Sequence, residues 1–251
     1  MFGTIFEEAK KLGRSPARLR EVFRPRRWRQ LFSILFFNAR TGNRWKSAPD
    51  AQPFKQREYS SYEQYLRHQQ SKFQYLDLAD YDLNYRRQLK ERLENVPFIK
   101  KGGNVLCLGA RQGTEVKAFH DLGCFAVGLD LNPGPENKFV LHGDFHHVQF
   151  PAGSVDVVFT NSLDHAFDPA KLIGEIKRLL KPDGILIIEA IHGEAQSTEP
   201  DHYASFWWQH LEDLIALLTR HGFNSLRRVS FREPWPGDQI CFELQKPGDV
   251  R

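Results

Sequence analysis

The stretch that decides the fold runs Asn104-Val-Leu-Cys-Leu-Gly-Ala-Arg-Gln-Gly-Thr-Glu-Val116. It joins a short apolar run to a turn with two glycines and then to the start of a helix. In an open parallel sheet, such a turn lets a ligand approach the backbone at the carboxyl end of a strand. Asp130 ends a second apolar run seventeen residues beyond Gly113, where a carboxylate can accept hydrogen bonds from two ribose hydroxyls. The stretch therefore predicts a nucleotide-binding site at a sheet edge.

Downstream of residue 100, apolar strands alternate with amphipathic helices. Strands are expected at 104–108, 125–130, 138–141, 155–160, 185–191, 226–231 and 239–244, and helices at 114–122, 169–180 and 206–220. Strands that are apolar almost throughout indicate a parallel sheet covered on both faces, and the last two strands are close enough to pair antiparallel.

The composition describes one globular domain with about a hundred additional residues. Of 251 residues, 41% are hydrophobic and 26% charged, which excludes a disordered or collagen-like chain. The longest apolar run near the start, residues 31–37, is shorter than the about 20 residues that cross a bilayer. We find no secretory signal pattern and expect a cytoplasmic protein. The cysteines lack metal-ligand spacing and are expected to be reduced core residues: Cys107, Cys124 and Cys241.

Charge is divided unevenly along the chain. Residues 1–47 contain twelve Lys and Arg against three acidic residues, a net charge of +9, whereas the rest of the chain carries −5. This basic arm also has an apolar stripe at helical spacing, formed by Trp28, Leu31, Phe32, Leu35 and Phe36. The stripe can pack on the body or on a second subunit, or lie at the inner face of an anionic membrane through residues 25–40, or the arm can bind a nucleic-acid backbone.

Several short motifs follow the nucleotide-binding turn in order. They are Gly143-Asp-Phe145, Phe150-Pro151, Ser154-Val-Asp-Val-Val-Phe159, Asp164-His-Ala-Phe-Asp-Pro169 and Leu179-Leu-Lys-Pro-Asp-Gly-Ile-Leu186. With these motifs, residues 100–245 resemble the class I S-adenosylmethionine-dependent methyltransferases, specifically the methyltransferase type 11 group. The resemblance implies an α/β fold with a Rossmann-like, doubly wound, mostly parallel seven-stranded sheet and an antiparallel C-terminal strand, preceded by a helical N-terminal extension. The methyltransferase domain is expected at 100–251.

The resemblance also implies which residues contact S-adenosylmethionine. They are Gly109, Ala110, Arg111 and Gly113 at the methionine end, Asn161 and Ser162 at the sulfonium, Asp130 at the ribose hydroxyls, and Leu131, Asp144 and Phe145 around the adenine. A nucleoside needs an acceptor pair for its diol, an acceptor for its amine and an apolar slot for its ring, and these residue types can supply them.

Two residues depart from the family's pattern. Cys107 stands where the family usually has an acid, two residues before the first glycine, and that acid normally receives the amino group of the cofactor. Arg111 stands where a central glycine is usual, and its cation can either pair with the cofactor's carboxylate or block it. A dinucleotide is disfavoured, because a pyrophosphate needs close approach of the backbone where Arg111 stands.

The helical zone before the sheet bears on the substrate. Residues 48–58 are expected to form a linker and residues 59–99 one or two helices. In the family, such helices fold over the cofactor as a lid, and Tyr62, Tyr65 and His68 fall on one helical face. Simple packing against the sheet edge is the alternative for this zone.

Methyl transfer to a hydroxyl requires a base at the rim of the sheet. The first candidate is His165, with Asp164 as the group that orients it, and the second is His192; Glu189, His146 and His147 are further rim residues. No metal is expected, because clustered carboxylates are few. The motifs of amino methylation and of attack on pyrimidine rings are missing, which favours O-methylation of a saccharide, lipid-linked or free, or of another small metabolite. The alternatives are an RNA methyltransferase that uses the arm and a catalytically silent scaffold.

Overall fold

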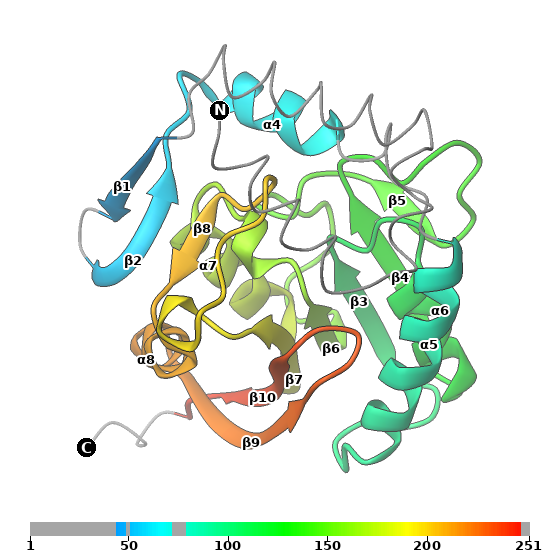
Figure 1. The fold of residues 1–251 in the computed structure, drawn as a ribbon. Coiled ribbons are helices and arrows are strands. Elements are labelled where there is room, and N and C mark those ends of the chain that lie inside the picture. Colours follow the sequence, from blue (N-terminus) through cyan, green and yellow to red (C-terminus); the bar gives the residue numbers. More distant parts are fainter. Residues whose placement is uncertain (1–43, 49–50, 72–78, 247–251) are drawn as a thin grey trace, which may run out of the picture. The chain divides into compact units, whose positions relative to one another are not determined.

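The computed structural model describes residues 44–48, 51–71 and 79–246 (Figure 1). These residues fall into two compact units, one with residues 44 and 58–71 and the other with residues 45–48, 51–57 and 79–246. The helices and the apolar stripe expected in the basic arm lie outside the described residues.

A seven-stranded sheet forms the centre of the larger unit, with the strand order β5-β4-β3-β6-β7-β10-β9. Its members are β3 (Asn104–Leu108), β4 (Phe125–Asp130), β5 (Val140–His142), β6 (Val155–Thr160), β7 (Leu180–Ile191), β9 (Phe223–Phe231) and β10 (Gly237–Leu244). The first five strands are parallel, and β10 is antiparallel to both β7 and β9. This arrangement confirms the predicted fold class.

The direction in which the sheet grows reverses at β3. The chain first moves outward through β4 to β5 and then returns to the other side of β3 with β6 and β7. The carboxyl ends of β3 and β6 therefore flank a topological switch point, which is where ligands bind in open α/β sheets.

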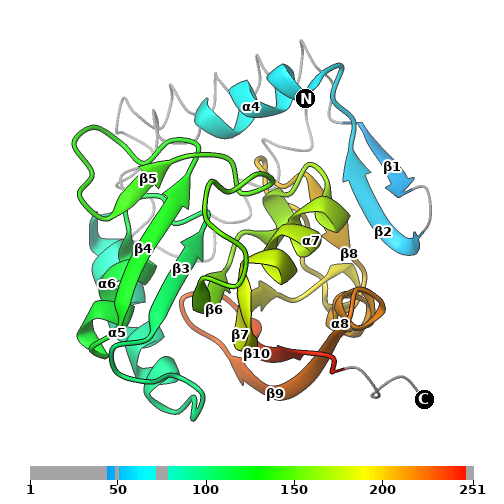
Figure 2. The same cartoon turned by 180° about the vertical axis from the view of Figure 1, so that it is seen from behind.

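Helices cover both faces of this sheet, as the opposite views in Figures 1 and 2 show. One core layer contains α5 (Ala79–Glu94) and α6 (Thr114–Asp121), and the other contains α7 (Pro169–Leu179) and α8 (Leu211–Arg220). Adjacent strand residues alternate between the layers: Leu106 packs in the α7–α8 layer and Cys107 in the α5–α6 layer. The strands are apolar throughout because both faces are buried. All three cysteines are buried and free, which confirms that prediction.

A second sheet corrects two expectations. It has the order β1-β2-β8, with β1 at Trp45–Ala48, β2 at Ala51–Arg57 and β8 at Phe206–Trp208. The expectation that residues 48–58 form a linker is therefore wrong. The strand was missed because Phe54 alone gives β2 an apolar face. The ring of Phe54 stacks on the ring of Phe206, with 5.0 Å between the ring centroids. The helix expected at 206–220 begins only at Leu211, because the aromatic residues before it pair with β2 as a strand.

Two helices occupy the described part of residues 59–99, as expected. The first is α4 (Tyr62–Gln70), whose N-cap Ser61 accepts a hydrogen bond from the Gln64 amide, and the second is α5. Tyr65 and His68 on α4 are buried, and the Tyr59 hydroxyl lies 2.9 Å from His68 Nδ1. The role of α4 as a lid stays a prediction.

Candidate functional site

The turn after β3 has a backbone that few side chains tolerate. Gly109, Arg111 and Gly113 have φ angles of 70°, 44° and 84°, in the left-handed region that favours glycine. A Cβ on Gly109 would lie 2.6 Å from the Cβ of Ser162, so the turn packs closely against the end of β6. The turn is also tied to β4, because the Gly109 amide donates to the Leu129 carbonyl at 2.9 Å.

Asp130 faces this turn from the end of β4. Its Oδ2 accepts a hydrogen bond from the Arg111 amide and its Oδ1 accepts one from the Asn132 amide, both at 2.8 Å. An ionised carboxylate has about four acceptor positions, so each oxygen can still accept a hydroxyl hydrogen. Leu131 follows directly and is half-buried. The carboxylate is therefore fixed beside the turn with acceptor positions to spare.

His146 positions Asp144 and has no nitrogen left for catalysis. Its Nδ1 lies 2.8 Å from Asp144 Oδ1, and its Nε2 accepts hydrogen bonds from the amides of Phe167 at 3.1 Å and Asp168 at 3.2 Å. Because Nε2 accepts, the ring carries its proton on Nδ1 and donates it to Asp144. This buried histidine ties the loop after β5 to the start of α7, so its place among the candidate bases is corrected. Phe145 beside it packs in the core.

We predict that His146→Ala lowers the free energy of unfolding by about 2–6 kcal/mol, because two partly buried amides lose their acceptor at about 1–3 kcal/mol each. Urea unfolding followed by tryptophan fluorescence measures this change. His147→Ala, which removes the exposed neighbouring ring, is the matched control and should change stability by less than about 0.5 kcal/mol. Equal effects of the two substitutions would contradict the assignment.

Polar side chains meet at the end of β6, beside the turn. Asn161 Nδ2 donates to the Tyr85 hydroxyl at 2.8 Å and to Glu115 Oε1 at 3.1 Å. Ser162 Oγ donates to the Gly109 carbonyl at 3.3 Å. The sequence-predicted Asn161 and Ser162 therefore lie together with the turn at the switch point. Tyr85 and Glu115 come from α5 and α6 and were not anticipated.

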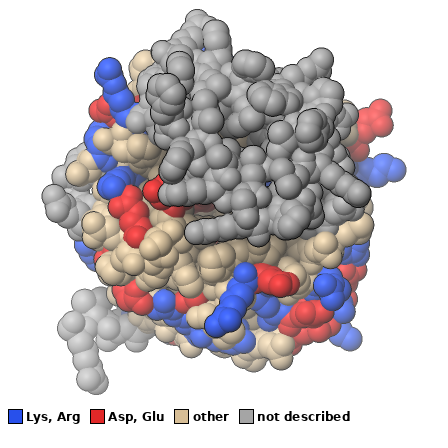
Figure 3. All heavy atoms as spheres, viewed as in Figure 1, with Lys and Arg blue, Asp and Glu red and all other residues tan. Residues whose placement is uncertain are grey.

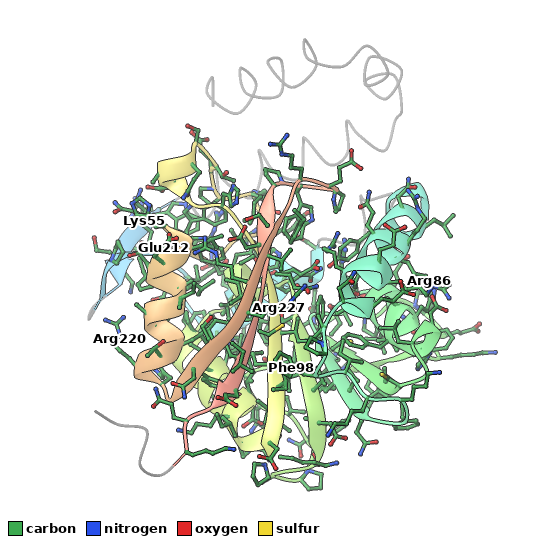
Figure 4. The ribbon with its side chains drawn as sticks, turned by 90° about the horizontal axis from the view of Figure 1, so that it is seen from below. Lys55, Arg86, Phe98, Glu212, Arg220 and Arg227 are labelled. Atoms are coloured by element: carbon green, nitrogen blue, oxygen red, sulfur yellow. The ribbon has the colours of Figure 1, made fainter. Side chains whose placement is uncertain are left out.

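Glu189 on β7 belongs to a buried ion pair. Arg92 donates to its two oxygens through Nε at 2.7 Å and Nη2 at 2.9 Å, Gln239 Nε2 donates at 3.0 Å, and the Tyr85 hydroxyl donates at 2.9 Å. Four donors use all acceptor positions of the carboxylate. Glu189 is thus a structural residue rather than a base. The pair lies beside a groove of about 810 Å³ between α5 and the β9–β10 hairpin, around Arg227 in Figure 4.

Comparison with known proteins identifies a domain within the larger unit. Residues 106–188, which include the turn, Asp130, Asp144 and the end of β6, match the family model described as a methyltransferase domain. Residues 106–188 therefore form a methyltransferase domain. No curated protein sequence matches the chain.

Solved structures share the fold of this chain. A 1,6-didemethyltoxoflavin-N1-methyltransferase from Burkholderia thailandensis, with its substrate and S-adenosylhomocysteine bound, is 15% identical, with a TM-score of 0.58 over 80% of this chain and 99% of that chain. An S-adenosylmethionine-dependent methyltransferase from Aquifex aeolicus is 19% identical, with a TM-score of 0.54 over 66% and 95%. A Haloferax volcanii protein in complex with the Trm112 methyltransferase activator is 19% identical, with a TM-score of 0.55 over 67% and 95%.

The two candidate bases differ in their surroundings. His165 ends the short helix η3 (Leu163–His165), directly after β6, and its Nδ1 donates to the Tyr203 carbonyl at 3.0 Å. With the proton on Nδ1, Nε2 is the basic nitrogen of the ring, and Asp164 Oδ2 lies 3.8 Å from it, beyond a direct hydrogen bond. His192 Nε2 lies 3.4 Å from Asp238 Oδ1, whose carboxylate also pairs with Arg228.

Among the described residues, one group brings possible metal-ligand atoms within 4.8 Å of one another: Asp164, His165 and Asp201. Asp201 Oδ1 already accepts hydrogen bonds from the amides of Tyr203 and Ala204, both at 2.7 Å. We therefore assign the group no metal.

Proposed function

We propose that this enzyme methylates a hydroxyl oxygen of a saccharide or of another small metabolite. The observation that carries the proposal is the convergence of the turn, Asp130 and the end of β6 at the switch point. The residues proposed to hold the cofactor are Gly109, Ala110, Arg111 and Gly113 at the methionine, Asp130 at the ribose, Leu131, Asp144 and Phe145 at the adenine, and Asn161 and Ser162 at the sulfonium.

The residues of the chain bind, align and deprotonate. Bound S-adenosylmethionine supplies an activated methyl group, so the protein has to hold the acceptor in line with it and exclude water. His165 Nε2 takes the hydroxyl proton, because its Nδ1 donates to the Tyr203 carbonyl and the residue lies in η3, the short helix that follows β6 in the chain. Asp164, whose Oδ2 lies 3.8 Å from the same nitrogen, is the group that orients the ring.

His165→Asn is expected to lower the methylation rate of a hydroxyl acceptor about 100-fold, as loss of a general base usually does. The asparagine amide can still donate to the Tyr203 carbonyl, so the affinity for S-adenosylhomocysteine should be unchanged. The release of S-adenosylhomocysteine measures the rate. His192→Asn is the control and should retain the rate within about 3-fold. A rate unaffected by His165→Asn, or lowered equally by both substitutions, would exclude His165 as the base.

The acceptor class is tested with methyl-labelled S-adenosylmethionine and separated fractions of a cell extract. Label in the soluble metabolite fraction supports the proposal, and label in the lipid fraction supports a lipid-linked saccharide. Label in RNA would favour the alternative of an RNA methyltransferase. On the face seen in Figure 3, the basic and acidic side chains of the described residues are interspersed, whereas a phosphate backbone favours clustered cations. No label in any fraction would favour a catalytically silent scaffold.

The basic arm is proposed to place the enzyme on an anionic membrane surface. Support comes from its net charge of +9 and from aromatic and basic residues between 25 and 40. None of the described helices is long and apolar enough to cross a bilayer. Flotation with vesicles that contain phosphatidylserine should carry the full chain upward at low salt, whereas neutral vesicles should not. Equal flotation with both kinds of vesicle, or no flotation with either, would exclude this role.

A further inference from the structure

Glu115 has a buried carboxylate with only one oxygen satisfied. It is the second residue of α6, and it is 1% exposed. Its Oε1 accepts a hydrogen bond from Asn161 Nδ2, whereas its Oε2 is buried without a hydrogen-bond partner among the described residues. Burial raises the pKa of Glu115 to about 7. A buried polar atom without a partner is costly, so the arrangement indicates a ligand for Oε2.

The charge of Glu115 reaches Cys107 in β3. Burial and the negative charge of Glu115 raise the pKa of the Cys107 thiol, so the carboxylate lies within electrostatic range of this position. Cys107 stands two residues before Gly109, where the sequence pattern of the resembling enzymes has an acid. The first turn of α6 thus supplies a carboxylate within electrostatic range of the β3 position that lacks one.

Other charges around Glu115 match both ends of an amino acid. The positive charge of Arg111 lowers the pKa of Glu115 and of Asp82, although burial raises the pKa of both acids overall. Asp82 on α5 also has a buried oxygen, Oδ1, without a hydrogen-bond partner among the described residues. One cation and two acids can bind a zwitterion, with its carboxylate on the guanidinium and its ammonium on a carboxylate.

The geometry points to Glu115 Oε2 as the acceptor for the α-ammonium of the methionine end of the cofactor, replacing the acid that position 107 lacks. Arg111 pairs with the cofactor's α-carboxylate on the other side. The inference rests on the proposed cofactor site and adds a binding residue to it. An ammonium brings three donors and a positive charge, which satisfy the open oxygen and favour the ionised carboxylate.

The test compares S-adenosylhomocysteine with its analogue that lacks the α-amino group. Calorimetry with the full-length chain should show that the wild type binds S-adenosylhomocysteine about 10- to 100-fold more tightly than the analogue, since a charge-assisted hydrogen bond is involved. Glu115→Gln should reduce this preference to about 3-fold or less, because it weakens the binding of S-adenosylhomocysteine and leaves the binding of the analogue unchanged. Glu91→Gln, on the exposed side of α5, is the matched control and should leave the preference unchanged.

The wild type provides a second readout that does not depend on a substituted side chain. The ionised form of Glu115 binds the ammonium, so affinity for S-adenosylhomocysteine should fall by up to about tenfold per pH unit below pH 7, whereas affinity for the analogue should not. The charged or titratable groups that face Glu115 are Arg111, Asp82 and Cys107, and Asn161 is its neutral partner.

The outcomes separate this inference from the proposed function. Binding of S-adenosylhomocysteine with a preference that Glu115→Gln leaves intact would overturn the inference and keep the cofactor site. An identical pH dependence for the two ligands would also overturn it. Failure of the wild type to bind either ligand would instead contradict the cofactor site itself. If Glu115→Gln does not fold, as circular dichroism would reveal, the pH profiles of the wild type decide.

Discussion

Asp130→Ala is expected to weaken the binding of S-adenosylhomocysteine about 1,000-fold. The substitution removes a charged acceptor for two ribose hydroxyls, and each hydrogen bond to a charged group contributes about 1.5–3 kcal/mol. It also removes the acceptor of the Arg111 amide, so the turn loses an anchor. Titration calorimetry with S-adenosylhomocysteine and with adenosine measures the effect. The binding of both ligands should weaken to a similar extent, because both contain the ribose.

Asp156→Ala is the matched control for this prediction. Asp156 lies at the opposite end of the sheet, in β6, where it accepts a hydrogen bond from the Asn104 amide at 2.8 Å and pairs with Lys181 at 2.8 Å. Its removal deletes a carboxylate with similar local contacts but should leave ligand affinity within about 3-fold. Asp130→Ala with an unchanged affinity would show that the ribose does not rest on Asp130.

Arg92→Met is expected to lower the free energy of unfolding by about 3–5 kcal/mol. Methionine retains most of the stem but leaves the Glu189 carboxylate, which is fully buried, without a cation. Removal of one partner of a buried ion pair leaves an uncompensated charge, which is the costly case. Urea unfolding at pH 7 measures the change.

Two further variants test whether the buried charge causes this loss. Arg92→Met combined with Glu189→Gln should recover more than half of the lost stability, because the amide carries no charge and can still bond to Gln239 and Tyr85. Arg86→Met on the same helix removes the exposed pair with Asp121 and should cost at most about 1 kcal/mol. Similar losses for Arg92→Met and Arg86→Met would contradict the role assigned to Glu189.

The regular part of the fold was predictable because its signals are local. Apolar runs such as 155–160 gave strands with the observed bounds, and Asp168 before Pro169 marks the start of α7, where its side chain accepts from the Lys171 amide. The aromatic run at 206–208 was assigned to a helix because its partner strand, β2, lies about 150 residues earlier. Such distant pairing has no local signal.

The candidate site was predictable where a residue follows a strand directly. Asp130, Asn161 and Ser162 lie at the ends of β4 and β6, and the structure brings them to the turn as expected. Glu115 was missed because an acid in the first turn of a helix is common at the surface. One signal was available in the sequence. Cys107 replaces the acid that the family's pattern has there, and Glu115 is an acid close to it in sequence.

A crystal structure of the full-length protein with S-adenosylhomocysteine tests the central claim most directly. We expect the adenosyl group at the carboxyl ends of β3 and β6, with both ribose hydroxyls within hydrogen-bond distance of Asp130. A ligand bound elsewhere, or a turn closed by the Arg111 guanidinium with Asp130 directed away from the sugar, would contradict the claim.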